Sequence, residues 1–125
     1  MRGGLARIPR YNGFMTGDPN VKNALRDLLA AMRELYGGRA PRALLYGSQA
    51  RGDATDASDV DVLLVYPDPI RPSEEIGRLE TVLADLNLSY GVLISILPVS
   101  SREYRRATGP LWKNIKNEGV LLDAR

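Results

Sequence analysis

A chain of 125 residues with 44% hydrophobic residues, 26% charged residues and a net charge of +2 has the size and composition of one ordinary globular domain. Without cysteine it has no disulfide, zinc–thiolate site or thiol nucleophile, and without histidine it has no Ser-His-Asp triad, imidazole base or imidazole-held metal. Any chemistry must rest on carboxylates, hydroxyls, Lys, Arg and bound ions, which makes an oxygen-ligated Mg²⁺ or Mn²⁺ the natural candidate cofactor.

The N-terminal segment shows neither helical nor strand periodicity. Residues 1–17 hold Gly, Arg and Pro in no regular pattern, and we expect a flexible tail there, followed by a single domain at 18–125. No apolar run reaches the ~20 residues that a membrane-spanning helix needs. Residues 1–10 also lack the apolar stretch of a secretory signal, so the predicted location is the cytoplasm, with no membrane partner.

Helical periodicity begins after residue 17. Asp18 is a candidate N-cap, Pro19 suits the first turn of a helix, and Gly37 stops the pattern, so we predict a helix that begins at Pro19 and ends before Gly37. Its apolar face is formed by Val21, Leu25, Leu28, Leu29, Met32 and Leu35.

Three short elements follow this helix. Residues 43–46 are an apolar run that predicts a strand ending at Gly47, and the polar stretch from Ser48 predicts a short helix and a loop. Residues 59–66 first alternate acids with valines and then become continuously apolar. That pattern is typical of a strand whose far end is buried on both faces.

The second half of the chain alternates in the same way. We predict a helix at 73–88, a strand at 92–99, a short basic helix opened by a capping box of Ser100 and Glu103, a helix at 111–118 and an edge strand at 120–122. The apolar stripe of the first of these helices is Ile76, Leu79, Val82, Leu83 and Leu86. This order predicts an α/β (α+β) fold with a small mixed β-sheet flanked by helices.

Asp59 and Asp61 are the first chemical signal. Because they are two residues apart on a predicted strand, their carboxylates project from one face, while Val60 and Val62 point into the core. Two carboxylates on one face repel each other unless a cation lies between them, so the pair suits a divalent metal. Taken alone, such a pair is more often a strand start that faces water.

Gly47 and Ser48 are the second signal. They stand where a strand becomes a short helix, so unpaired backbone N–H groups and the positive helix end are available to a phosphate. Gly47 permits close backbone approach, and the Ser48 hydroxyl can donate to a phosphate oxygen. Alone, these residues more often form a plain strand–helix connection with a Ser cap. Arg51 by itself is expected to pair with Asp53 or Asp56 and hold the loop.

Together these residues carry a specific resemblance. The order Gly-Ser-x-Ala-Arg-Gly at 47–52, followed by Ser-Asp-x-Asp at 58–61, resembles the signature of DNA polymerase β-like nucleotidyltransferases. It is most similar to the minimal nucleotidyltransferases, small proteins of bacteria and archaea that are often paired with a separately encoded helical HEPN partner.

The resemblance implies a polymerase β-like nucleotidyltransferase fold and a reaction. A nucleoside monophosphate would pass from a nucleoside triphosphate to a hydroxyl of a protein or RNA, with Mg²⁺ or Mn²⁺ as cofactor. The site residues implied are Gly47, Ser48, Arg51 and Ser58 for nucleotide binding, and Asp59 and Asp61 for catalysis and metal binding.

The resemblance fails at one position. The family's third carboxylate, which binds the metal beside the attacking hydroxyl, lies on a later strand, but residues 92–99 contain no acid and Ser95 is its replacement by position. A hydroxyl is a weaker metal ligand than a carboxylate and a poor base at neutral pH. Three explanations stay open: an acid such as Glu103 or Asp85 reaches in, a partner supplies one, or the chain binds nucleotide without efficient turnover.

Two functional hypotheses follow. The first is a metal-dependent nucleotidyltransferase. The second is a catalytically weak or inactive antitoxin-like module that acts by binding a HEPN-type protein partner. A homodimer is a further way to complete so small a site.

A basic run near the C-terminus leaves nucleic-acid binding open. Such a run can contact RNA, an acidic protein or phosphates, but it is more often the solvated face of helices. Its members are Arg102, Arg105, Arg106, Lys113 and Lys116. Tyr104 and Trp112 are expected to pack against the core rather than to anchor a partner.

Overall fold

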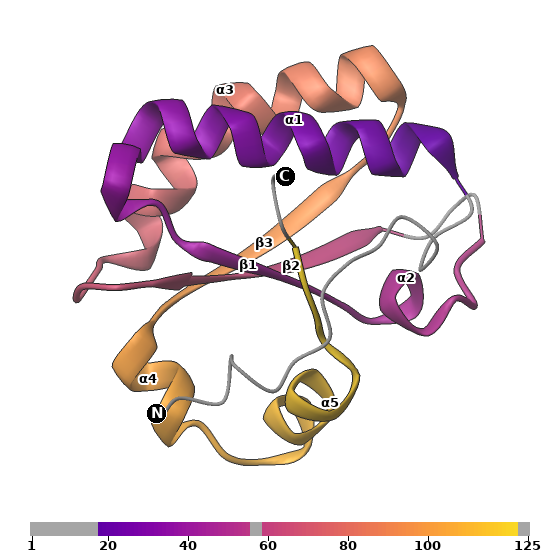
Figure 1. Ribbon diagram of the computed structural model, residues 1–125. Helices are drawn as coiled ribbons and strands as arrows, with labels where there is room; N and C mark the ends of the chain where they lie inside the picture. Colours follow the sequence, from indigo (N-terminus) through magenta and orange to yellow (C-terminus); the bar gives the residue numbers. More distant parts are fainter. Residues whose placement is uncertain (1–17, 56–58, 123–125) are drawn as a thin grey trace.

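The computed structural model describes residues 18–55 and 59–122, so the tail predicted at 1–17 lies outside the described residues. A four-stranded sheet, with strand order β3-β2-β1-β4, lies between two layers of helices (Figure 1). The elements are α1 (Pro19–Tyr36), η2 (Gly37–Arg39), β1 (Arg42–Tyr46), α2 (Ser48–Arg51), β2 (Val60–Tyr66), α3 (Pro72–Tyr90), β3 (Ile94–Ser100), α4 (Ser101–Arg106), α5 (Pro110–Glu118) and β4 (Val120–Leu121). The predicted mixed sheet with flanking helices is confirmed.

Strand β2 lies between β1, with which it is antiparallel, and β3, with which it is parallel. The first pairing places Tyr46 opposite Asp61, and the second places Ser95 beside Asp61. Strand β4 pairs with the outer side of β1, as expected of the predicted edge strand. Residues from three strands therefore meet at one end of the sheet, where β1 ends and β2 and β3 begin.

Successive side chains of β2 point to opposite faces of the sheet, and each face has its own apolar cluster. Val60 and Val62 pack beneath α1 and α3, whereas Leu63 packs with α4 and α5. Residues 62–66 are all buried, as their continuous apolar run predicted. This alternation puts Asp61 on the side of the sheet that carries α4 and α5.

Helix α1 is capped at both ends as the sequence predicts, and a glycine also ends α3. The Asp18 carboxylate accepts a hydrogen bond of 2.8 Å from the backbone N–H of Asn20, which satisfies one of the free donors at the start of α1. Gly37 ends α1 with a φ of +61°, and Gly91 ends α3 with a φ of +67°. Both are left-handed values that glycine adopts without steric cost.

One end of each long helix departs from the predicted apolar stripe. Leu35 is 49% exposed and Ile76 is 45% exposed, although both were expected to face the core. Their sequence neighbours Tyr36 and Glu75 point inward instead, and the Tyr36 hydroxyl donates a hydrogen bond of 2.7 Å to the Glu75 carboxylate. A polar contact between the two helices thus replaces the apolar one that helical spacing alone predicts.

The second helical layer begins with the predicted capping box. The Ser100 hydroxyl accepts from the Glu103 N–H at 3.1 Å, and the Glu103 carboxylate accepts from the Ser100 N–H at 3.0 Å. Tyr104 is buried and meets Trp112 of α5 edge to face, with ring centroids 6.3 Å apart, so both aromatics pack against the core as expected. Among residues 18–55 and 59–122, no helix has the length and apolar character needed to cross a membrane.

Candidate nucleotide and metal site

Asp59 and Asp61 lie at the start of β2, on the side of the sheet opposite α1 and α3. The strand begins at Val60, one residue later than predicted, so Asp59 immediately precedes it. Asp61 is half-buried and Asp59 is exposed. Buried Val60 and Val62 face the α1 and α3 layer. The two acids, which alternate with these valines, therefore lie on the other face, as their spacing predicted.

Gly47 joins this pair of acids to the turn between β1 and α2. Its φ of +75° lies where side chains other than hydrogen are strained, and a Cβ added there would lie 2.6 Å from Oδ2 of Asp61. The Asp61 carboxylate therefore occupies the space that a side chain at Gly47 would need. No other residue type fits between them without displacing one or the other.

The turn after Gly47 offers backbone donors. The N–H groups of Ala50 and Arg51 donate to the Gly47 carbonyl at 3.1 Å each, which closes the single turn of α2. The N–H groups of Ser48 and Gln49 come earlier and have no acceptor within that helix. Such donors suit an anion, although α2, with four residues, contributes only a small helix dipole.

The electrostatics at Asp61 favour a cation. Partial burial raises the pKa of Asp61, the neighbouring charge of Asp59 raises this pKa further, and the Arg51 guanidinium lowers it. Burial, followed by the Asp61 charge, also raises the pKa of the Tyr46 hydroxyl across β1. Two carboxylates thus repel each other at this end of β2, and a divalent ion bound to them would remove that repulsion.

Ser95, which sequence position suggests as the replacement for a third carboxylate, lies on β3. It stands beside Asp61 in the parallel register and its side chain is exposed. Glu103, one proposed substitute, is held in the capping box by Ser100, and Ser100 itself lies five residues beyond Ser95, roughly 16 Å along the strand. Asp85, the other, lies on α3, which covers the opposite face of the sheet. Neither acid reaches the site.

The described residues fit one kind of metal site. Across residues 18–55 and 59–122, no group of three or more Asp, Glu, His or Cys side chains is placed to hold an ion. Mg²⁺ is commonly bound by one or two carboxylates, with its remaining positions filled by water and substrate phosphate oxygens. Asp59 and Asp61 suit that arrangement, and they do not suit an ion enclosed by protein ligands.

Arg51 ties the α2 turn to two acids. Its Nε lies 3.2 Å from Oδ2 of Asp53, which confirms one of the two expected partners, whereas Asp56 lies outside the described residues. Its Nη1 also lies 3.3 Å from Oε1 of Glu118 at the end of α5. Sequence reasoning missed this second pair because its members are 67 positions apart. Ser58, a predicted nucleotide contact, likewise falls outside the described part of the chain.

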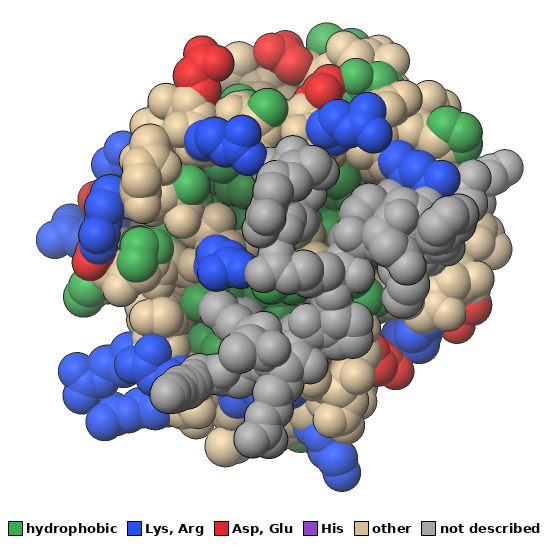
Figure 2. Space-filling model, viewed as in Figure 1, with side chains coloured by type: hydrophobic (Ala, Val, Ile, Leu, Met, Phe, Trp, Pro, Cys, Tyr) green, Lys and Arg blue, Asp and Glu red, His purple; other side chains and the backbone are tan. Residues whose placement is uncertain are grey.

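The basic run lies mainly on the surface. Arg102, Arg105, Arg106 and Lys113 are exposed, and Figure 2 shows Lys and Arg side chains gathered at the lower left, over α4. Lys116 is different, since its ammonium donates to the Ala107 carbonyl at 3.0 Å and lies 5.1 Å from the centre of the Tyr104 ring. It therefore joins α5 to the end of α4.

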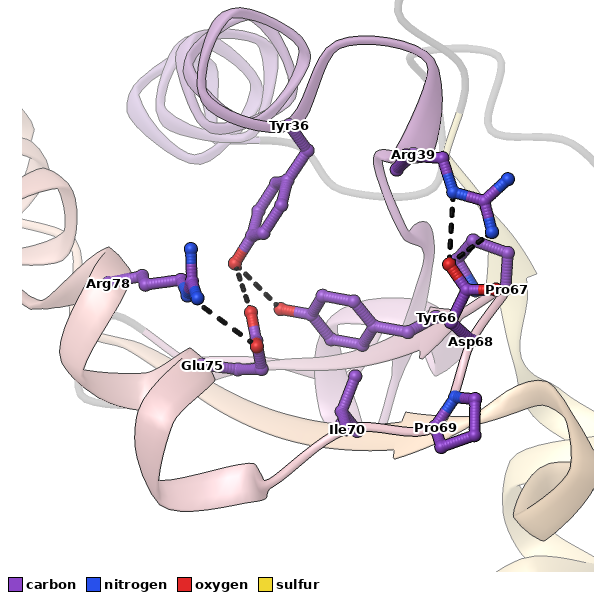
Figure 3. A pocket seen from close by; sticks show the side chains of 9 residues that line it. All are labelled: Tyr36, Arg39, Tyr66, Pro67, Asp68, Pro69, Ile70, Glu75 and Arg78. Carbon is purple, nitrogen blue, oxygen red and sulfur yellow. Dashed lines mark hydrogen bonds and ion pairs between the residues drawn. The ribbon is translucent and has the colours of Figure 1, made fainter.

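A shallow pocket of about 190 Å³ lies at the far end of β2, away from the two aspartates (Figure 3). The Tyr36 hydroxyl donates to Glu75, so the Tyr66 hydroxyl, 3.1 Å away, donates to Tyr36. Arg78 pairs with the same Glu75 carboxylate at 3.6 Å. Burial is the main cause that raises the pKa of Tyr66, and the hydrogen bond to Tyr36 adds to it. Each central polar group of this pocket is thus engaged by a neighbour.

Known proteins resemble this chain in sequence and in fold. A protein of Methanocaldococcus jannaschii, provisionally named a protein adenylyltransferase, is 29% identical over 104 residues, which cover 82% of this chain and 98% of that protein. A provisionally named nucleotidyltransferase from Sulfolobus solfataricus has a crystal structure that matches with a TM-score of 0.57 at 15% identity, covering 87% of this chain and 90% of the other. The toxin–antitoxin structure MntA-HpeT matches with a TM-score of 0.50 at 18% identity, covering 78% and 70%.

The two solved structures bear out the fold. A sequence model of the family described as "Nucleotidyltransferase domain" matches residues 25–121, a range that contains the turn at Gly47 and both aspartates of β2. Since that match covers most of the chain, this protein belongs to the nucleotidyltransferase domain family.

Proposed function

We propose that this chain is a divalent-metal-dependent nucleotidyltransferase of the minimal type, which moves a nucleoside monophosphate from a nucleoside triphosphate to a hydroxyl of a protein or RNA. One observation carries the proposal. The carboxylate of Asp61, which is suited to a metal ion, lies so close to Gly47, in the turn suited to phosphate, that a Cβ added at Gly47 would be 2.6 Å from Oδ2 of Asp61. Asp59 adds a second negative charge beside it.

In this reaction the acceptor oxygen attacks the α-phosphorus and forms a new O–P bond. The bond from the α-phosphorus to the bridging oxygen breaks, pyrophosphate leaves with that electron pair, and the hydroxyl proton passes to water. Asp59 and Asp61 would hold Mg²⁺ or Mn²⁺, which supplies neutralisation of the phosphate charge. Gly47 and Ser48 would orient the triphosphate through N–H and hydroxyl donors.

Two further residues complete the proposed nucleotide site. Arg51 stands at the end of the α2 turn with its side chain 44% exposed, so one of its donors can turn towards a phosphate while others keep their bonds to Asp53 or Glu118. Ser58, which directly precedes Asp59 in the sequence, would add a further contact with the nucleotide. The name of the M. jannaschii relative favours ATP as the donor and a protein as the acceptor.

The test is a calorimetric titration of the protein with ATP, GTP, CTP and UTP, each with and without Mg²⁺. We expect Mg²⁺-dependent binding of at least one nucleotide. A double variant, Asp59→Asn with Asp61→Asn, should lose this binding and remain folded by circular dichroism. Equal binding by the wild-type protein and this variant would contradict the metal site, and no binding of any nucleotide by the wild-type protein would contradict the proposed function.

One observation favours a second candidate function. Ser95 stands beside Asp61 where a third carboxylate is expected, and losing half of a two-metal clamp costs orders of magnitude in rate. The chain would then act as a weak enzyme or as an antitoxin-like module that binds a HEPN-type partner. Its fold similarity to the toxin–antitoxin structure MntA-HpeT is consistent with this alternative.

The substitution Ser95→Asp separates the two candidates. If the site lacks only a metal ligand, this change should raise transfer of label from α-phosphate-labelled ATP, measured on a lysate of the source cell. Ser95→Asn, which has nearly the same size but no charge, is the matched control and should give no gain. Absence of any gain with Ser95→Asp would favour the partner-binding module.

A further inference from the structure

The outer edge of β3, beside the two aspartates, has no neighbouring strand among residues 18–55 and 59–122. In the described sheet β3 bonds only to β2, and the opposite edge strand, β4, has just two residues. The edge of β3 that begins near Ser95 is therefore the longer surface on which another extended chain can pair. Exposed backbone donors and acceptors of this kind are templates for an added strand.

We propose that the acceptor is an extended segment of a protein, which pairs as an additional strand along the first half of the outer edge of β3 and so brings its hydroxyl beside Ser95 and Asp61. This inference rests on the proposed transferase function and specifies the acceptor of the same site. It assigns a docking surface and a mode of recognition to the protein acceptor that the name of the M. jannaschii relative favours.

The hydrogen bonds of β2 fix which backbone groups of β3 point outward. The Val60 N–H donates to the Leu93 carbonyl at 2.9 Å, so in a parallel pair the groups of residues 93, 95, 97 and 99 face β2. The N–H and C=O groups of Ile94 and Ile96 consequently face away from the sheet. They flank Ser95 on both sides, which puts the free backbone donors and acceptors at the site.

Pro98 limits how far an added strand can run. It occupies the next outward-facing position, where its lack of an N–H breaks no bond to β2. Such a position on an edge strand is the usual place for proline in a sheet. Regular pairing therefore ends after Ile96. Only the first half of the edge, which lies beside the two aspartates, is available, and this sets the register of an added segment relative to Asp61.

The side chains near this edge leave space for an acceptor. Ser95 is short, uncharged and exposed, where a carboxylate would fill the room above the strand. Leu93 is 57% exposed, and the parallel register continued by one residue places it beside Asp59. An exposed leucine next to two acids offers an apolar contact to a side chain of the segment, close to its reacting hydroxyl.

Charge favours a protein segment over RNA at this edge. Asp61 pairs in register with Ser95, and a divalent ion bound to Asp59 and Asp61 would cancel their two negative charges without leaving a positive excess, so this edge offers a polyanion no attraction. The cations of α4 follow the opposite end of β3. A peptide backbone, by contrast, matches the alternating donors and acceptors of Ile94 and Ile96 without carrying charge.

The test uses peptide libraries in which a central Ser, Thr or Tyr is flanked by random residues, with α-phosphate-labelled ATP and Mg²⁺. Ile96→Pro removes the outward N–H, and Pro98 shows that the outward positions of this strand accept proline. Ile96→Ala also removes most of the isoleucine side chain but keeps the backbone N–H, so it is the matched control for Ile96→Pro. We expect label transfer to fall about tenfold or more in Ile96→Pro relative to Ile96→Ala, which corresponds to one lost hydrogen bond whose partner stays unpaired.

A second arm tests the period of the pairing on the peptide itself. N-methylation at the positions that bond to β3 should stop transfer, and N-methylation one residue along should leave it intact. Calorimetry with ATP and Mg²⁺ should give equal binding for both Ile96 variants. Failure of that binding in the wild-type protein would count against the proposed function itself, and not against the docking edge alone.

Several outcomes would overturn the inference while the nucleotide site stands. They are equal transfer by the two Ile96 variants, transfer that ignores the position of N-methylation, and ATP binding without transfer to any peptide. Label that appears instead on RNA or on a second copy of this chain would identify a different acceptor and would equally reject the proposal.

Discussion

At the scale of single residues, Gly47 is the position that tolerates least change. A methyl group there would lie 2.6 Å from the Asp61 carboxylate, and the φ of +75° strains any other residue. We expect Gly47→Ala to lower the free energy of unfolding by about 1–3 kcal/mol and to weaken Mg²⁺–ATP binding. Urea unfolding and calorimetry measure both. Gly38→Ala is the control, because nothing lies within 4 Å of a Cβ at that position, and equal losses in the two variants would contradict the argument.

Asp61 predicts a dependence of stability on pH. Burial and the Asp59 charge hold its folded pKa above the ordinary 3.8, so the folded protein binds this proton more tightly than the unfolded chain. In the pH window between the ordinary pKa of Asp61 and its higher folded pKa, the free energy of unfolding falls as pH rises, and the loss persists at neutral pH. In EDTA, Asp61→Asn should therefore melt above the wild-type protein at neutral pH, by a margin that disappears below the window. A lower melting temperature at neutral pH would refute this, and the exposed Asp85→Asn should have little effect.

At the scale of elements, α1 and α3 meet at two hydroxyl–carboxylate contacts of different burial. The Tyr36 hydroxyl donates to Glu75, which is only 6% exposed, whereas the Tyr90 hydroxyl donates to Asp27 at the surface. Tyr36→Phe leaves a buried carboxylate without its hydroxyl donor and should cost about 1–3 kcal/mol in urea unfolding. Tyr90 joins the same helices at their other ends, and Tyr90→Phe should lower the free energy of unfolding much less than Tyr36→Phe does, since water replaces the lost partner. Similar costs would mean that burial does not govern these contacts.

The sequence predicts the elements well because their signals are local. The cap at Asp18 and the stop signal at Gly37 place the ends of α1, the predicted range 73–88 comes within two residues of both ends of α3, and the alternation of acids and valines places β2. The inward turn of Glu75 is different, because it depends on Tyr36, which is 39 positions away. Apolar periodicity alone cannot reveal a buried polar partner of that kind.

Local signals also place the motif residues of the candidate site close to one another. The motif residues Gly47 and Asp61 come together because a short turn and one strand pair connect them. The bond from Arg51 to Glu118 required the path of α5, and the strand order that leaves β3 at the edge depends on pairings distant in sequence. Contacts of this range are set by tertiary packing, for which a single sequence carries no periodic signal.

For the molecule as a whole, charge is divided unevenly between the layer of α4 and α5 and the rest of the fold. Residues 101–118, which form α4 and α5, carry five basic and two acidic side chains, a net charge of +3. The other described residues carry eight basic and eleven acidic side chains, a net charge of −3. The small total charge therefore hides a positive face, and anions should approach the protein from the side of α4.

This division predicts how binding of a generic polyanion responds to salt. For a short DNA duplex, each contact between a cation and a phosphate adds roughly 0.9 to the slope of log K against log salt concentration. Arg102→Glu with Arg105→Glu should therefore lower the slope by about 2, measured by fluorescence anisotropy. Arg26→Glu with Arg33→Glu changes the net charge equally but lies on α1, so it should lower the slope by less than about 1. Equal effects of the two pairs would mean that binding follows total charge, and that the face formed by α4 and α5 has no directing role.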